Sequence, residues 1–148
     1  MQDVLQVYQN YKVLIVPAVV WFIAQASKLI ITWITDKRLD FSQLTTTGGM
    51  PSAHSATVCA LATTIGKTDG WASTFFAISA FFALIVMYDA GSVRHTVGTQ
   101  SALLNKILDG LFRDNIEFEQ RLKEFIGHTR IEIVIGALLG TGLAWWWA

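Results

Sequence analysis

The chain has 148 residues, of which 53% are hydrophobic and only 15% are charged, and its formal net charge is zero. Soluble domains carry about a quarter of charged residues, so this composition favours a membrane protein. Without a net positive charge there is no basic field to attract nucleic acid, and the single cysteine excludes an internal disulfide. The length fits one domain over residues 1–148.

Four apolar segments predict an all-α, polytopic membrane bundle. The first, residues 13–34, is long enough to span the bilayer core. The second, residues 54–65, is shorter and would be a partial or tilted element. The third, residues 71–88, is dense in Phe and Ala and is typical of a spanning helix. The fourth, residues 131–147, has small residues that permit close helix contact, and its three tryptophans are typical of an interfacial anchor.

A more polar stretch, residues 89–125, separates the last two apolar segments. Its leucines and isoleucines recur with a helical period, at Leu103, Leu104, Ile107, Leu108 and Leu111. This pattern predicts one or two amphipathic helices that lie along the membrane face.

Lysine and arginine are distributed unequally between the two sides of such a bundle. With four spans, the 36–53 loop and the 89–130 stretch share one side, which carries most of the cations: Lys37, Arg38, Arg94, Lys106, Arg113, Arg121, Lys123 and Arg130. The opposite side has only Lys12 and Lys67. Because positive charge is retained in the cytoplasm, we expect the cation-rich side to be cytoplasmic.

His54 stands at the start of the second apolar segment, directly after Pro51, Ser52 and Ala53. A proline fits the first turn of a helix, and a serine there can cap the helix or donate to a phosphate oxygen. Helix N-termini carry unpaired N–H groups and a partial positive charge, which favour bound anions. A simple helix cap beside a partly solvated histidine explains the same residues.

His128 and Glu132 stand four residues apart at the start of the fourth segment. If that segment is helical from Gly127, both side chains lie on one face. A carboxylate fixes the tautomer of a neighbouring imidazole and raises its basicity, which prepares a nucleophilic or basic histidine. An ordinary i,i+4 polar pair is one alternative, and zinc held by two histidines and a glutamate is another. No H-x-x-x-H or C-x-x-C spacing supports zinc, so we predict no metal.

Three cations complete the candidate site. Lys28 lies within the first apolar segment, Arg38 follows its end, and Arg94 begins the polar stretch. Arginine and lysine suit phosphate oxygens, although each of these cations taken singly also fits a headgroup contact or a snorkelling anchor. Asp89, which could orient Arg94, and Asn105 are weaker candidates for supporting roles.

These residues resemble the type 2 phosphatidic acid phosphatase superfamily, and specifically its divergent branch of small bacterial and plant membrane proteins. The general family carries a lysine–arginine motif, a Pro-Ser-Gly-His motif and a Ser-Arg…His-x-x-x-Asp motif. The corresponding residues are Lys28 and Arg38, then Pro51-Ser52-Ala53-His54, then a split third motif of Ser92, Arg94, His128 and Glu132. Ala53 departs from the glycine, Glu132 departs from the aspartate, and about thirty residues separate Arg94 from His128.

The resemblance implies a phosphatase that needs neither metal nor cofactor. His128 would attack phosphorus and form a phosphohistidine, Glu132 would hold its other ring nitrogen, and His54 would serve as general acid and then general base. The phosphate oxygens would be held by Lys28, Arg38, Ser52 and Arg94.

The expected partners are the bilayer and a lipid phosphate, with no nucleic acid, and a homo-oligomer is left open. A site on the cytoplasmic face of a bacterial plasma membrane favours phosphatidylglycerophosphate or phosphatidic acid. The opposite orientation would suit undecaprenyl diphosphate. Two non-enzymatic alternatives remain, which are a lipid-binding or assembly protein of the same fold and a transporter or channel subunit with intramembrane relay groups.

Overall fold

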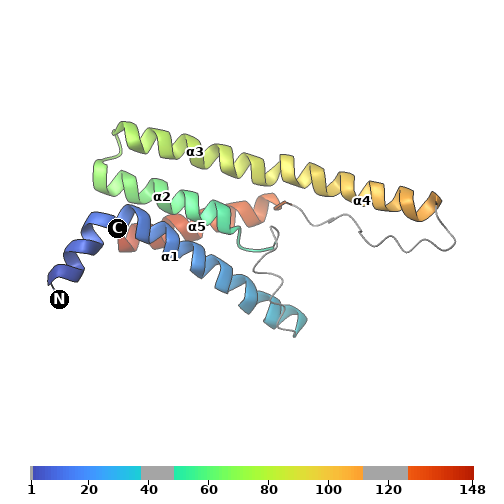
Figure 1. The fold of residues 1–148 in the computed structure, drawn as a ribbon, viewed down its shortest axis with the longest axis horizontal. Helices are drawn as coiled ribbons and strands as arrows, with labels where there is room; N and C mark the ends of the chain where they lie inside the picture. Colours follow the sequence, from blue (N-terminus) through green and yellow to red (C-terminus); the bar gives the residue numbers. More distant parts are fainter. Residues whose placement is uncertain (1, 38–48, 112–126) are drawn as a thin grey trace.

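The computed structural model describes residues 2–37, 49–111 and 127–148, and every regular element in these ranges is an α-helix. The helices are α1 (Gln2–Asp36), α2 (Ala53–Asp69), α3 (Thr74–Gly91), α4 (Val93–Leu111) and α5 (Arg130–Trp147). Figure 1 shows them as a bundle from which α4 extends to one side. The predicted all-helical fold class is therefore confirmed.

The short helix α2 occupies the centre of the bundle. It packs against α1, α3 and α5, and its buried positions are mostly alanine, serine and threonine. Small side chains let neighbouring backbones approach closely, which suits helix packing inside a membrane. The sequence predicted a short second element, and the structure adds that α2 makes the most extensive contacts with α1, α3 and α5.

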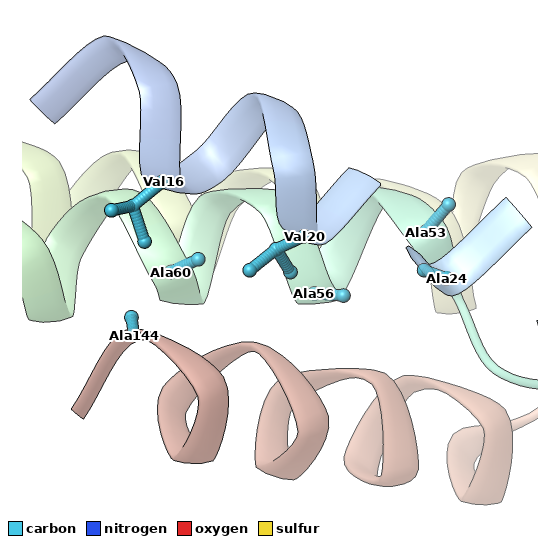
Figure 2. Close-up of a cluster of buried hydrophobic side chains, with 7 residues drawn as sticks. All are labelled: Val16, Val20, Ala24, Ala53, Ala56, Ala60 and Ala144. Atoms are coloured by element: carbon cyan, nitrogen blue, oxygen red, sulfur yellow. The ribbon is translucent and has the colours of Figure 1, made fainter. Parts of the chain in front are cut away.

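The apolar core lies where α1, α2 and α5 meet. Figure 2 shows that the core side chains are all small, and they are Val16, Val20, Ala24, Ala53, Ala56, Ala60 and Ala144. At Gly140 of α5, an added Cβ would run into the carbonyl group of Ala56. Close contact between α2 and α5 therefore requires glycine at this position.

Helix α1 is longer than its apolar segment, because it begins at Gln2 and not near residue 13. The added residues mix apolar side chains (Val4, Leu5, Val7) with polar ones, so they did not stand out as part of a continuous apolar segment. Pro17 lies inside the helix, and α1 bends in its N-terminal part (Figure 1). Proline removes one helix hydrogen bond and is a common cause of such bends.

Helices α3 and α4 are separated by a single residue, Ser92, whose N–H still donates to the Tyr88 carbonyl oxygen at 2.9 Å. As a result α4 continues nearly along the axis of α3 (Figure 1). The predicted helix within residues 89–125 is present at Val93–Leu111, and residues 112–125 lie outside the described part. The expected position of this stretch on the membrane face remains a prediction.

Two helical segments are long and apolar enough to cross a membrane, Gln6–Ile34 in α1 and Thr74–Leu108 across α3 and α4. Among the described residues, neither α2 nor α5 meets the same combined requirement of length and apolar character. The expected number of four spans therefore remains a prediction.

Candidate functional site

Three chain segments converge at one end of the bundle, where α2 and α5 begin and α3 ends (Figure 1). The Ser52 N–H donates to the Glu132 carbonyl oxygen at 3.1 Å, which ties the start of α2 to the first turn of α5. The His128 N–H donates to the Ala90 carbonyl oxygen at 3.0 Å, which ties the start of α5 to the end of α3. We call this region the site end.

His128 and Glu132 contact each other through a capping box. Helix α5 is capped by Thr129, whose hydroxyl accepts from the Glu132 N–H at 3.4 Å. The Glu132 carboxylate reaches back and contacts both the Thr129 N–H at 3.2 Å and His128 Nδ1 at 3.0 Å. Helix α5 begins at Arg130, so a helix from Gly127 is not what brings His128 and Glu132 together. The pair forms because a glutamate at this cap position points backward along the chain.

Gly127 holds this segment against the junction of α3 and α4. Its φ of 113° lies in the left-handed region that favours glycine. An added Cβ would also meet the backbone of Arg94 and His95. Conformation and close approach both require glycine here, and together they set His128 beside Arg94.

The imidazole of His128 is almost fully buried, with a relative exposure of 1%. Burial lowers the pKa of His128 below its ordinary value; the hydrogen bond with Glu132 opposes this shift, and the positive charges of Lys28 and Arg94 add to it. A neutral ring beside a carboxylate carries its proton on Nδ1, which leaves the Nε2 lone pair available. Nε2 is buried and has no hydrogen-bond partner among the residues that the structure describes.

His54 lies in the first turn of α2 and is exposed. Its ring centroid is 6.2 Å from that of His128, with the ring planes inclined by 61°. Arg94, His128 and Lys28 all interact electrostatically with it. Two histidines that are far apart in the chain therefore lie next to each other.

Arg94 is positioned by Asp89, whose Oδ2 accepts from Nε at 2.7 Å across the α3–α4 junction. Both side chains are about two-fifths exposed. Because this ion pair uses Nε, the terminal nitrogens of the guanidinium remain able to bind an anion.

Lys28 belongs to the same cluster, although it lies on α1. It is buried, with a relative exposure of 3%. It interacts electrostatically with Glu132 and with both histidines. This placement differs from that of a lysine whose ammonium extends to the headgroups.

Ser52 is the N-cap of α2, and its buried hydroxyl accepts from the Ser55 N–H at 3.3 Å and the Ser55 hydroxyl at 3.1 Å. Its backbone packs directly on Gly136 of α5, where an added Cβ would meet the Ser52 carbonyl group. The capping role is therefore present in the geometry, and the phosphate-binding role of Ser52 remains a prediction.

The structure does not bring every candidate together. Arg38 lies outside the described residues. Asn105 is buried on α4, eleven residues after Arg94, and among the described helices α4 contacts only α3. Asn105 is not among the groups that act on either histidine. Within the described ranges, no three His, Cys, Asp or Glu residues are grouped so that they could hold a metal ion.

The sequence analysis did not identify the residues that hold the site residues in position. Thr129 caps α5, and its N–H donates to the Glu132 carboxylate. The pattern Thr129-x-x-Glu132 is a capping-box signature that can be recognised in the sequence. The Ala90 carbonyl and the contact of Gly136 with Ser52 have no comparable signal, because they depend on how the helices pack.

These features define a helical membrane protein with paired histidines, a carboxylate and two cations at one end of the bundle. The chain belongs to the Divergent PAP2 family, which matches residues 9–143. It is 41% identical over 128 residues to the "Uncharacterized membrane protein YuiD" of Bacillus subtilis (strain 168), a match that covers 79% of this chain and 81% of that protein. No solved structure matches the chain.

Proposed function

We propose that this protein is a membrane lipid-phosphate phosphatase that acts through a phosphohistidine formed on His128. The observation that carries the proposal is the state of this ring, which is buried, held at Nδ1 by Glu132 and unpartnered at Nε2 among the described residues. A buried polar atom without a partner is uncommon and calls for an explanation. An attacking lone pair aimed at a bound phosphate supplies one.

The family resemblance supplies the roles of the groups in the proposed reaction, and their proximity supports it. Nε2 of His128 attacks phosphorus, and Glu132 stabilises the positive charge that develops on the ring. His54 protonates the leaving alkoxide, then removes a proton from the water that cleaves the phosphohistidine. Lys28 and Arg94 stabilise the charge on the nonbridging oxygens, with Arg38 and Ser52 in the same role by resemblance.

The two departures from the general family pattern are compatible with this chemistry. The methyl group of Ala53 belongs to the apolar core beside α1, so it is accommodated by packing (Figure 2). The longer side chain of Glu132 lets one carboxylate reach both Thr129 and His128.

The substrates that we propose are phosphatidylglycerophosphate and phosphatidic acid, because the acyl chains can stay in the bilayer while the phosphate enters the site. Both require the site end to face the cytoplasm of a bacterial plasma membrane. A cysteine placed at Ser92, in a Cys59→Ala background, tests this orientation in intact cells. Labelling by a membrane-impermeant thiol reagent would contradict the cytoplasmic assignment.

The test of the function uses protein reconstituted in vesicles and measures phosphate release from phosphatidylglycerophosphate, phosphatidic acid and undecaprenyl diphosphate. Brief reaction with ³²P-labelled substrate should trap an acid-labile phosphoenzyme. His128→Ala should abolish both the phosphoenzyme and the release. The matched control is His95→Ala, because His95 is exposed on α4 and should be dispensable.

The outcomes separate the alternatives. Release from undecaprenyl diphosphate alone would replace the proposed headgroups and reverse the orientation. Phosphate or vanadate binding without release from any lipid would favour a non-catalytic lipid-binding protein. Normal turnover by His128→Ala would exclude the phosphohistidine mechanism.

A further inference from the structure

An apolar groove of about 570 Å³ lies between α3 and α5. It is lined by Leu84, Ile85, Met87 and Tyr88 of α3 and by Ile133 of α5. The groove is shallow and opens widely to the surroundings of the bundle.

The groove is adjacent to the site end along both α3 and α5. Tyr88 directly precedes Asp89, the partner of Arg94, and Ile133 directly follows Glu132, the partner of His128. At this end the two helices are joined by the hydrogen bond from His128 to Ala90 and by the contact of Ile133 with Gly91. The groove residues of α3 lie within two helical turns of Asp89, and each turn rises by about 5.4 Å. One lipid molecule is therefore long enough to reach from the groove to the cations.

The chemistry of the groove matches a hydrocarbon chain. Leu84, Ile85 and Tyr88 are exposed along its rim, within the apolar segment Thr74–Leu108 that is long enough to span a membrane. Met87 closes it on one side by contacting α2, where its sulfur lies 3.8 Å from that of Cys59. An apolar groove that leads to a cluster of cations fits a molecule with an apolar chain and an anionic head.

We propose that this α3–α5 groove holds an acyl chain of the lipid whose phosphate lies between His54 and His128. The inference rests on the proposed function and adds to it the feature that selects lipid phosphates over soluble ones. Chain binding here contributes equally to the ground state and the transition state, so it acts mainly on KM.

The first test blocks the groove. Ile85→Trp places a larger ring in it, and Ile78→Trp is the matched control, because Ile78 is equally exposed on α3 but lies two turns outside the groove. With long-chain phosphatidic acid, we expect Ile85→Trp to raise KM by at least about fivefold with little change in kcat. With dibutyryl phosphatidic acid, both variants should match the unsubstituted protein. Equal effects of Ile85→Trp on both substrates, or of both variants on the long-chain one, would overturn the proposal.

The second test does not depend on turnover, so it separates failure of the groove from failure of the proposed function. Phosphatidic acid with a diazirine near the middle of one acyl chain is crosslinked to the protein in phosphatidylcholine vesicles. We expect labelling in peptides that contain residues 84–88 and 133, which excess unlabelled phosphatidic acid should displace. Labelling elsewhere, or equal displacement by added phosphatidylcholine, would overturn the groove assignment even in an active enzyme. Specific labelling of a protein that releases no phosphate would retain the groove and reject the catalytic function.

Discussion

The two ends of the bundle both combine cations with helix termini, but the cations face different groups. At the far end, defined by Lys12, Lys67 and the last residues of α5, the lysines contact the helix C-terminus. Lys12 Nζ donates to the Ala148 carbonyl oxygen at 3.2 Å, and Lys67 Nζ donates to that of Trp145 at 2.6 Å. These contacts satisfy carbonyl groups that have no partner within the helix. Trp71 stacks on Trp145 at 5.9 Å between centroids, which closes the far end with aromatic rings.

At the site end, by contrast, Arg94 is paired with Asp89 and Lys28 interacts with Glu132, and both cations also lie near the two imidazoles. The nearby helix N-termini present N–H groups, so cations and helix dipoles act there in the same direction and favour an anion. The comparison teaches that the number of cations near a membrane face does not mark a functional site. The groups that those cations face distinguish an anchor from an anion-binding cluster.

Among variants that keep the His128 ring, the largest expected effect follows from removing His54, the exposed histidine of the site end. His54→Ala should slow phosphate release by roughly 10²–10⁴-fold, because a positioned general acid and base contributes that much. Steady-state release from reconstituted protein measures the effect. A rate within twofold of the unsubstituted protein would show that another group transfers the proton.

The difference between the two ends is tested directly by one substitution at each. Lys28→Met should lower kcat/KM by roughly 10²-fold, since it removes a charge that stabilises the phosphate in the transition state. Lys67→Met should change kcat/KM by less than about twofold, because this lysine contacts a carbonyl group at the far end. Equal losses in the two variants would mean that both cations act through bundle stability.

The close contact between α2 and α5 is tested by two glycines of the same helix. Gly140→Ala should destabilise the protein by roughly 1–3 kcal/mol, because its methyl group would overlap the Ala56 carbonyl group. Gly142→Ala meets nothing within 4 Å, so its higher helix propensity should leave stability unchanged or raised. Thermal denaturation in detergent compares the two. A Gly140→Ala variant as stable as Gly142→Ala would show that the helices separate freely at this point.

The smallest effect is the dependence on pH. Because burial lowers the pKa of His128, the ring stays neutral and nucleophilic as the pH falls to its ordinary value of about 6.5. The rate of phosphoenzyme formation should therefore hold constant down to this pH and decline only below it. In the same window an unfolded histidine binds more protons than the folded one, so the free energy of unfolding should decrease as the pH falls through about 6.5. If the rate of phosphoenzyme formation instead declined already above pH 6.5, the interaction with Glu132 would outweigh burial in setting the pKa of His128.

Much of the fold could be predicted from the positions of the apolar segments in the sequence alone. The last apolar segment was placed at 131–147 and is helical over Arg130–Trp147. The first apolar segment, residues 13–34, marks only part of α1, because the helix also includes the preceding residues 2–12, in which polar and apolar side chains are mixed. The central position of α2 could not be predicted from the sequence. It depends on which helix faces with small residues pack against one another, and several segments have such faces.

The candidate site could be predicted as a set of residues, but its geometry could not. The sequence singled out His54, His128 and Glu132, and the structure brings them together. It could not indicate that Ser52 would donate to Glu132 or that Gly136 would pack on Ser52, because these contacts arise between separate helices. Asn105 lies on α4, which extends away from the rest of the bundle (Figure 1) and contacts only α3 among the described helices.

Glu132 connects assembly with reactivity. Its carboxylate caps α5 and orients the His128 ring, and its carbonyl group receives the N–H that begins α2. A single residue thus takes part in the start of two helices and in the orientation of the imidazole ring beside them.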